Sequence, residues 1–248
     1  MRNTRLIPGV PLAIKAPMWR TIVLSLLLSL PAPRGSHAQE FIAVPDIISD
    51  EAFYRLVSCA ASPGGECRKP LIYWPEERRL ALRVGIAATA DSFRDYRFDI
   101  VDAAIDAAIA EINGAGAHLF LERVYEGEID IPFYLVDTPQ GGTISGTGVD
   151  ELDGSSIAIG RVAIRSRGGD IVAATIAISQ DIRRREIASV ILEELVQSLG
   201  LVTDIASPAY ELSIFAENGN SMTRLRGQDA SALRRHYPRP GVPEPDSN

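Results

Sequence analysis

The sequence has 248 residues with 25 basic and 32 acidic side chains, a formal net charge of −7. Residues 1–38 carry five of the basic side chains and none of the acidic ones, so the remaining chain has a net charge of −12. A surface this acidic repels phosphate backbones, which disfavours nucleic-acid binding. The 210 residues after position 38 are enough for one domain with a full hydrophobic core.

Residues 1–38 are predicted to be an export signal. Basic side chains precede an apolar run over residues 22–30, and small residues close the segment at positions 36–38. The run is too short to span a bilayer, which needs about 20 residues. Its ending suits cleavage before Gln39, and the long basic part leaves Met18 open as the true start. We therefore expect a periplasmic or secreted bacterial protein that touches a membrane only if this signal stays uncleaved.

Cys59 and Cys67 are the only cysteines of the chain, and a Pro-Gly-Gly turn lies between them. The turn lets the two ends meet, and an oxidising compartment would keep a bond between them closed. We therefore predict a disulfide, with two unrelated thiols as the alternative. A zinc site built on these thiols is poorly supported, because no further cysteine is present.

The spacing of apolar residues predicts a mixture of strands and helices after the cysteine loop. The predicted strands span residues 80–87, 118–124, 131–137, 156–165 and 171–179, and the predicted helices span residues 98–112, 182–199 and 222–236. A weaker helix is expected over residues 50–57. Residues 141–154 are rich in glycine, serine and threonine, which predicts a mobile loop too flexible to join the core.

We find no internal repeat and no sign of a second domain. The expected organisation is a signal peptide over residues 1–38, an N-terminal extension with the disulfide loop over 39–79, one domain over 80–237 and a disordered tail over 238–248. The tail is predicted from its proline content.

The stretch from Glu193 to Asp204 has the frame of a zinc-protease helix, H-E-x-x-H-x-x-G-x-x-(H/D). In that motif two histidines one turn apart hold the metal, and the glutamate acts as base. Here Glu193 and Gln197 stand at the histidine positions, while Glu194 keeps the base position. Gly200 stands where the helix must stop, and Asp204 lies one residue beyond the usual third-ligand position. The frame is kept and the zinc ligands are not.

On a helical wheel Glu194 falls inside the apolar arc of this helix, whereas Glu193 and Gln197 fall together on its edge. Burying an unpaired charge is costly, so Glu194 must be paired, protonated or facing a cleft. The alternative is a structural role, with its carboxyl bonded to arginine or backbone groups in the core. An acid/base pair of Glu193 with Glu194 is disfavoured, because adjacent helical residues diverge by about 100°.

Metal binding at this motif would need ligands other than histidine. After position 38 only His118 and His236 remain, so a three-histidine zinc site is impossible within one chain. The oxygens of Glu193, Gln197 and Asp204 suit calcium, magnesium or manganese better than zinc, although amide oxygens are weak donors. We expect no cofactor, with a divalent ion as the alternative. The sequence contains no nucleophile elbow and no phosphate-binding loop.

On these residues the chain resembles a secreted bacterial domain of unknown function, number 2927, related in pattern to the metzincin-like zinc peptidases. The features that carry the resemblance are the motif Glu193–Asp204, the segment Glu211–Phe215 where those peptidases have their Met-turn, the ending His236–Gly241, and the cysteine loop followed by Lys69, Pro70 and Trp74. The resemblance covers most of residues 40–241. It implies an α+β, zincin-like fold, with a mixed twisted sheet, two packed long helices and a C-terminal helix. It does not imply a zinc site, and Phe215 at the Met-turn position is a further departure.

Two functions follow from this resemblance. The first is an exported zincin-like domain without the histidine zinc ligands, which acts as a non-peptidase binding or scaffold protein of the cell envelope. Its partner would be an envelope protein or a peptide. The second is a hydrolase or peptidase-like enzyme that uses Glu194 as general base, with a metal held by oxygen ligands.

Overall fold

The structure, a computed structural model, describes residues 41–219 and 221–241. The predicted export signal, its cleavage site and most of the predicted C-terminal tail lie outside the described residues. Within the described ranges, no helix has both the length and the apolar composition needed to cross a membrane.

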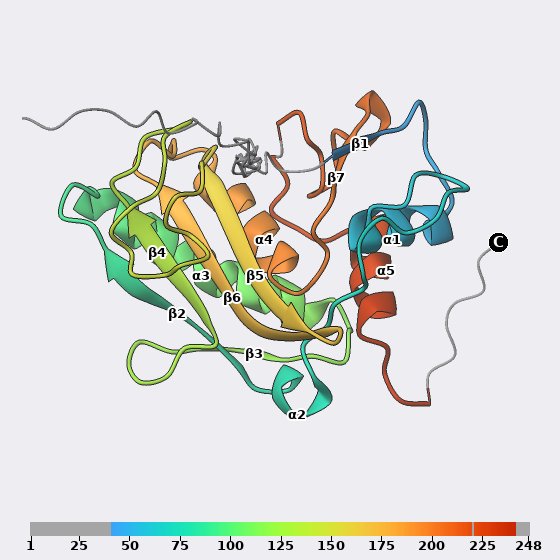
Figure 1. Ribbon diagram of the computed structural model, residues 1–248, viewed down its shortest axis with the longest axis horizontal. Helices are drawn as coiled ribbons and strands as arrows, with labels where there is room; N and C mark the ends of the chain where they lie inside the picture. Colours follow the sequence, from blue (N-terminus) through green and yellow to red (C-terminus); the bar gives the residue numbers. More distant parts are fainter. Residues whose placement is uncertain (1–40, 220, 242–248) are drawn as a thin grey trace, which may run out of the picture. The chain divides into compact units, whose positions relative to one another are not determined.

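The fold is built on a five-stranded mixed sheet with the strand order β3-β2-β4-β6-β5 (Figure 1). Its strands are β2 (Leu82–Thr89), β3 (Leu121–Arg123), β4 (Ile131–Val136), β5 (Gly160–Arg167) and β6 (Asp170–Ser179). All neighbours run parallel except β5, which runs antiparallel to β6. The sheet and the helices packed on it give an α+β architecture, which confirms this part of the prediction.

β5 and β6 form the predicted hairpin. Its turn holds Gly168 and Gly169 at φ values of 63° and 96°, and a two-residue hairpin turn with positive φ at both positions requires such residues. In the part of the chain that the structure describes, no strand pairs with the outer side of β5. β5 is therefore an edge strand of the sheet.

Two helices, α3 (Asp95–Gly114) and α4 (Ile187–Gln197), pack against each other on the sheet (Figure 1). The apolar residues of α3 that recur at helical spacing are buried: Val101, Ala104, Ile105, Ala108, Ile109 and Ile112. α4 begins at Ile187, later than the sequence predicted, because the preceding residues form turns in which Arg183 pairs with Glu186. Both helices direct their apolar sides into one hydrophobic core shared with the sheet.

The loop between β4 and β5 differs from its prediction. Ile144 and Leu152 are fully buried and form a second, smaller core with Ile157 and two residues of the sheet. Asp153 holds the loop in shape, since its carboxylate accepts hydrogen bonds from the N–H and hydroxyl of Thr147 at 3.0 and 2.8 Å. The prediction that residues 141–154 are too flexible to join the core is wrong, because two apolar side chains anchor this glycine-rich segment.

The segments at the two ends of the described chain pack together. β1 (Phe41–Ala43) pairs in parallel with β7 (Asp204–Ala206), and α1 (Asp50–Cys59) packs against α5 (Gly227–His236) (Figure 1). A short 3₁₀ turn, η1 (Pro208–Tyr210), follows β7.

A disulfide joins Cys59 at the end of α1 to Cys67, with an S–S distance of 2.04 Å. The predicted disulfide is therefore confirmed.

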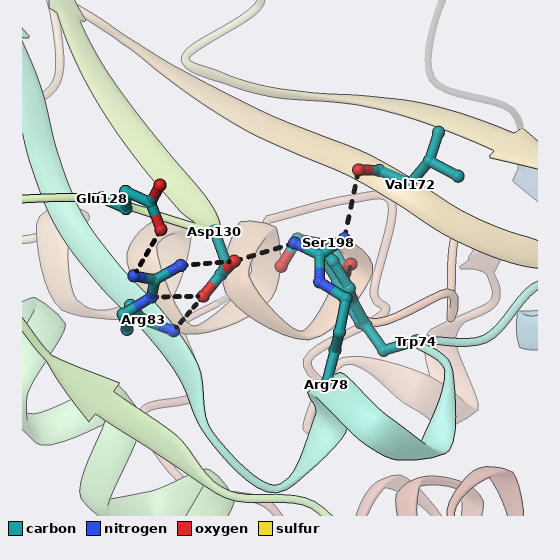
Figure 2. Close-up of polar contacts among 7 residues, drawn as sticks. All are labelled: Trp74, Arg78, Arg83, Glu128, Asp130, Val172 and Ser198. Carbon is teal, nitrogen blue, oxygen red and sulfur yellow. Dashed lines mark hydrogen bonds and ion pairs between the residues drawn. The ribbon is translucent and has the colours of Figure 1, made fainter.

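A polar network next to the sheet holds Trp74 in place (Figure 2). Asp130 accepts hydrogen bonds from Arg83 at 2.9 Å and from Arg78, in α2 (Glu76–Arg79), at 2.8 Å. Burial raises the pKa of Asp130, but these bonds outweigh it and lower the pKa to about 2. Arg78 also donates to the carbonyl of Val172 at 3.3 Å and lies 4.7 Å above the ring of Trp74. Trp74 in turn contacts the end of α4.

Candidate functional site

The end of α4 is fixed by aromatic side chains from distant segments. The indole N–H of Trp74 donates to the carbonyl of Ser198 at 3.0 Å, and the hydroxyl of Tyr237 donates to the carbonyl of Leu199 at 2.6 Å. These bonds satisfy carbonyls that a helix leaves without partners at its C-terminus. The chain then turns at Gly200, whose φ is 103°, a conformation that favours glycine. The predicted helix stop is therefore present.

A cleft of about 1060 Å³ lies beside α4. Its lining comes from β5, from the loop before it, from α4, from β7, from the segment after β7, and from residues 41, 69 and 72 nearer the N-terminus. The lining residues that carry the argument below are Lys69, Glu151, residues 160–164, Glu193, Gln197, Asp204 and Glu217. Three of the four residues singled out in the motif, Glu193, Gln197 and Asp204, thus meet in one cleft.

Gln197 and Asp204, both in the lining of this cleft, are bonded to each other. The amide nitrogen of Gln197 donates to Oδ1 of Asp204 at 3.0 Å. Both side chains are nearly inaccessible, with exposed fractions of 2% and 1%. In the zinc-protease motif a histidine would face the metal from the position of Gln197; here the Gln197 amide bonds instead to Asp204, which lies one residue beyond the usual third-ligand position.

Glu194 lies between α4 and β5. A Cβ atom placed on Gly160 would come within 2.3 Å of Oε1, so the carboxyl packs directly on the glycine of β5. The backbone N–H of Val162 donates to the same carboxyl. The residue is only 3% exposed, and Oε2 is fully buried with no hydrogen-bond partner among the described residues. The helical wheel placed Glu194 among buried residues, and the structure places it there.

The electrostatic surroundings favour the neutral form of Glu194. Burial raises its pKa well above the usual value, and the nearby carboxylates of Glu193 and Asp204 raise it further. Arg161 and the N–H of Val162 act in the opposite direction without cancelling the rise. A general base must be ionised and within reach of a substrate proton. Here burial and the neighbouring carboxylates raise the pKa of Glu194, and its carboxyl packs against β5.

Neither histidine lies in the cleft lining. His118 precedes β3 and contacts a guanidinium nitrogen of Arg79 at 3.2 Å. His236, in α5, stacks on Tyr73 with 4.3 Å between ring centres and contacts the carbonyl of Ile72 at 2.9 Å. Burial lowers the pKa of His236 to about 4, so it is neutral. Within the described ranges, no group of three or more His, Cys, Asp and Glu side chains is arranged to hold a metal ion.

The segment at the Met-turn position is tied to α5. Asp229 accepts hydrogen bonds from the hydroxyl of Ser213 at 2.6 Å and from the N–H of Ile214 at 3.0 Å. Phe215 is fully buried and packs edge-on against Phe53, with 6.0 Å between ring centres. Asp229 therefore sets the course of the turn that carries Glu217 into the cleft lining.

Sequence reasoning missed Gly160, Arg161 and Glu217. A glycine at the start of an apolar strand indicates close approach of another group, and this signal was present at Gly160. Arg161 and Glu217 gave no signal, because only folding brings β5 and the turn after β7 to the same cleft.

Residues 150–241 match a family model described as "Protein of unknown function (DUF2927)". The matched segment contains β5, β6, α4, β7 and α5, and therefore most of the cleft lining. No curated protein matches the chain.

Proposed function

We propose that this chain is an exported, zincin-like binding protein of the cell envelope, which holds an extended peptide in the cleft beside β5 without cleaving it. The observation that carries the proposal is the course of β5. Residues 160–164 of this edge strand line the cleft, and within the described residues no strand pairs with that side. An unpaired strand edge presents backbone N–H and C=O groups to which an extended peptide can add as a further strand. Along β5 the N–H of Val162 is held by Glu194, so the peptide would use the other backbone groups of this edge.

The absence of cleavage is proposed from the position of Glu194. Its carboxyl packs on Gly160, is buried and favours the neutral form. A base role would need β5 to move away from α4 and the carboxyl to ionise. The bond between Gln197 and Asp204 supports the same conclusion, because it occupies Gln197, the side chain at a metal-ligand position of the peptidase motif. The side chains that a hydrolase would need for a base or a metal are therefore packed on, or bonded to, other groups of the protein. For this reason we propose binding without hydrolysis.

The envelope location and the zincin-like fold have support of a coarser kind. The Cys59–Cys67 disulfide is typical of proteins from oxidising compartments. The mixed sheet and the helices packed on it are compatible with the α+β class of that fold. The family match over residues 150–241 covers the part that carries the motif.

The test is peptide binding by the exported protein, purified from the periplasm. Fluorescently labelled extended peptides should bind, and peptides N-methylated at alternate backbone nitrogens should bind much more weakly, because strand addition uses those N–H groups. Glu194→Gln, which keeps the size of the side chain, should leave binding and folding intact.

Three results would count against the proposal. Cleavage of a bound peptide that disappears in Glu194→Gln would establish the enzyme instead. So would one divalent ion per chain in metal analysis, lost on Glu193→Ala together with activity. If no extended peptide binds at all, the cleft has another role.

A further inference from the structure

Phe41 brings a large aromatic side chain to the cleft. It is 49% exposed, whereas its neighbour in β1, Ile42, is only 6% exposed and belongs to the hydrophobic core. Side chains of a strand alternate between its two faces, so Phe41 points away from the core. It lines the cleft, and its pairing opposite Asp204 of β7 fixes its position there. A half-exposed aromatic side chain in a concave site is typical of a ligand contact.

Apolar side chains from other segments also line the cleft. Ile72 comes from the segment between the disulfide and α2, and Val202 from the connection between α4 and β7. β5 adds Val162 and Ile164. Each of these side chains is partly exposed, so the cleft offers an apolar ligand group several partners besides Phe41.

Most charged side chains of the cleft lining already interact with other groups of the protein. Asp204 accepts a hydrogen bond from Gln197 at 3.0 Å, and Glu151 pairs with Arg165 at 2.5 Å. The other lining residues with such interactions are Lys69, Arg161 and Glu193. Glu217 is the remaining carboxylate among the lining residues, and burial raises its pKa. A charged ligand group would therefore leave water for a site where most counter-charges are already engaged, which is costly.

We propose that the peptide held in this cleft places a large, uncharged apolar side chain against Phe41. The inference rests on the proposed function, since it takes the ligand to be a peptide, but it does not depend on which backbone groups of β5 that peptide uses. Burial of the exposed part of Phe41 favours the apolar side chain. The engagement of the cleft charges within the protein disfavours a charged one.

The test compares three labelled heptapeptides by fluorescence anisotropy. Their central residue is phenylalanine in the first, alanine in the second and lysine in the third. The other positions are serine and threonine, so each peptide can take the register that brings its central residue to Phe41. We expect the phenylalanine peptide to bind about tenfold tighter than the alanine peptide, because it buries more apolar surface. The lysine peptide should bind no tighter than the alanine peptide, and the order should persist at high salt, which screens charges but not apolar contacts.

The outcomes separate this inference from the proposed function. Equal affinity of the phenylalanine and alanine peptides would overturn the inference and leave peptide binding intact. Tightest binding by the lysine peptide would overturn it as well, and would assign recognition to Glu217. Binding by none of the three would contradict both this inference and the proposed function.

Variants of two phenylalanines locate the contact. Phe41→Ala should weaken binding of the phenylalanine peptide about tenfold and leave the alanine peptide unchanged. Phe120→Ala is the matched control, because Phe120 is 47% exposed and lies outside the cleft lining. Thermal unfolding shows whether each variant is folded. Phe41→Leu keeps a large apolar side chain and should retain most of the preference, so the test remains valid if Phe41→Ala does not fold. If Phe41→Ala and Phe120→Ala have the same effect on the phenylalanine peptide, Phe41 does not contact the ligand.

Discussion

A methyl group added at Gly200 would collide with two neighbours of the end of α4. The new Cβ would lie 2.3 Å from the carbonyl oxygen of Ile72 and 2.8 Å from Nε2 of His236. These two atoms also contact each other at 2.9 Å, so neither can move away without breaking that bond. The backbone at Gly200 has φ at 103°, which adds strain for any residue with a side chain.

The expected cost of Gly200→Ala has two terms: the backbone strain at Gly200 and the loss of the hydrogen bond between His236 and Ile72. The unfavourable φ costs about 2 kcal/mol, and losing the His236–Ile72 hydrogen bond costs about 1 kcal/mol more. We therefore expect the free energy of unfolding to fall by about 3 kcal/mol, which corresponds to a Tm lower by roughly 10 °C for a chain of this size. Urea unfolding followed by circular dichroism measures the loss directly.

Gly116→Ala is the matched control for the backbone term. Gly116 has a similar φ of 86°, and its nearest neighbour to an added Cβ is the flexible Arg234 side chain at 3.7 Å. This variant should lose only the strain of about 2 kcal/mol. If both variants lose the same stability, the collision at Gly200 contributes nothing and the account of the helix end is wrong.

Three further predictions concern the loop, the acid of α5 and the disulfide. Ile144→Ala should lower the free energy of unfolding by about 2–5 kcal/mol, because Ile144 is fully buried; a change near zero would mean that the loop is mobile after all. Burial raises the pKa of Asp229 to about 6 from its usual 3.8, so the folded state binds the proton more tightly and stability should fall by about 3 kcal/mol as the pH rises from about 3 to about 7. Asp229→Asn should remove that part of the slope in unfolding measured across this range, and an unchanged slope would contradict the assignment. Replacing Cys59 and Cys67 by serine should cost about 2–3 kcal/mol from loop entropy, and mass spectrometry that finds two alkylatable thiols in the protein purified without reductant would refute the bond itself.

Local patterns account for the features that the sequence predicted correctly. The helical spacing of Val101, Ile105 and Ala108 located α3, and the wheel of α4 placed Glu194 among the buried residues. The cysteine pair and the Gly168-Gly169 hairpin needed only neighbours in the chain. Each of these depends on residues within a few positions of one another, and such contacts are visible in a single sequence.

The sequence by itself therefore determined the α+β class, the disulfide and a helix that keeps the shape of a metal motif without its histidines. Tertiary structure alone decided what that helix faces. The glycine of β5 covers Glu194, the chain after Gly200 returns Asp204 to Gln197, and the turn held by Asp229 brings Glu217 to the same cleft. These contacts join segments far apart in the chain, and the free energy that selects them comes from burying the whole core at once, which no local pattern records.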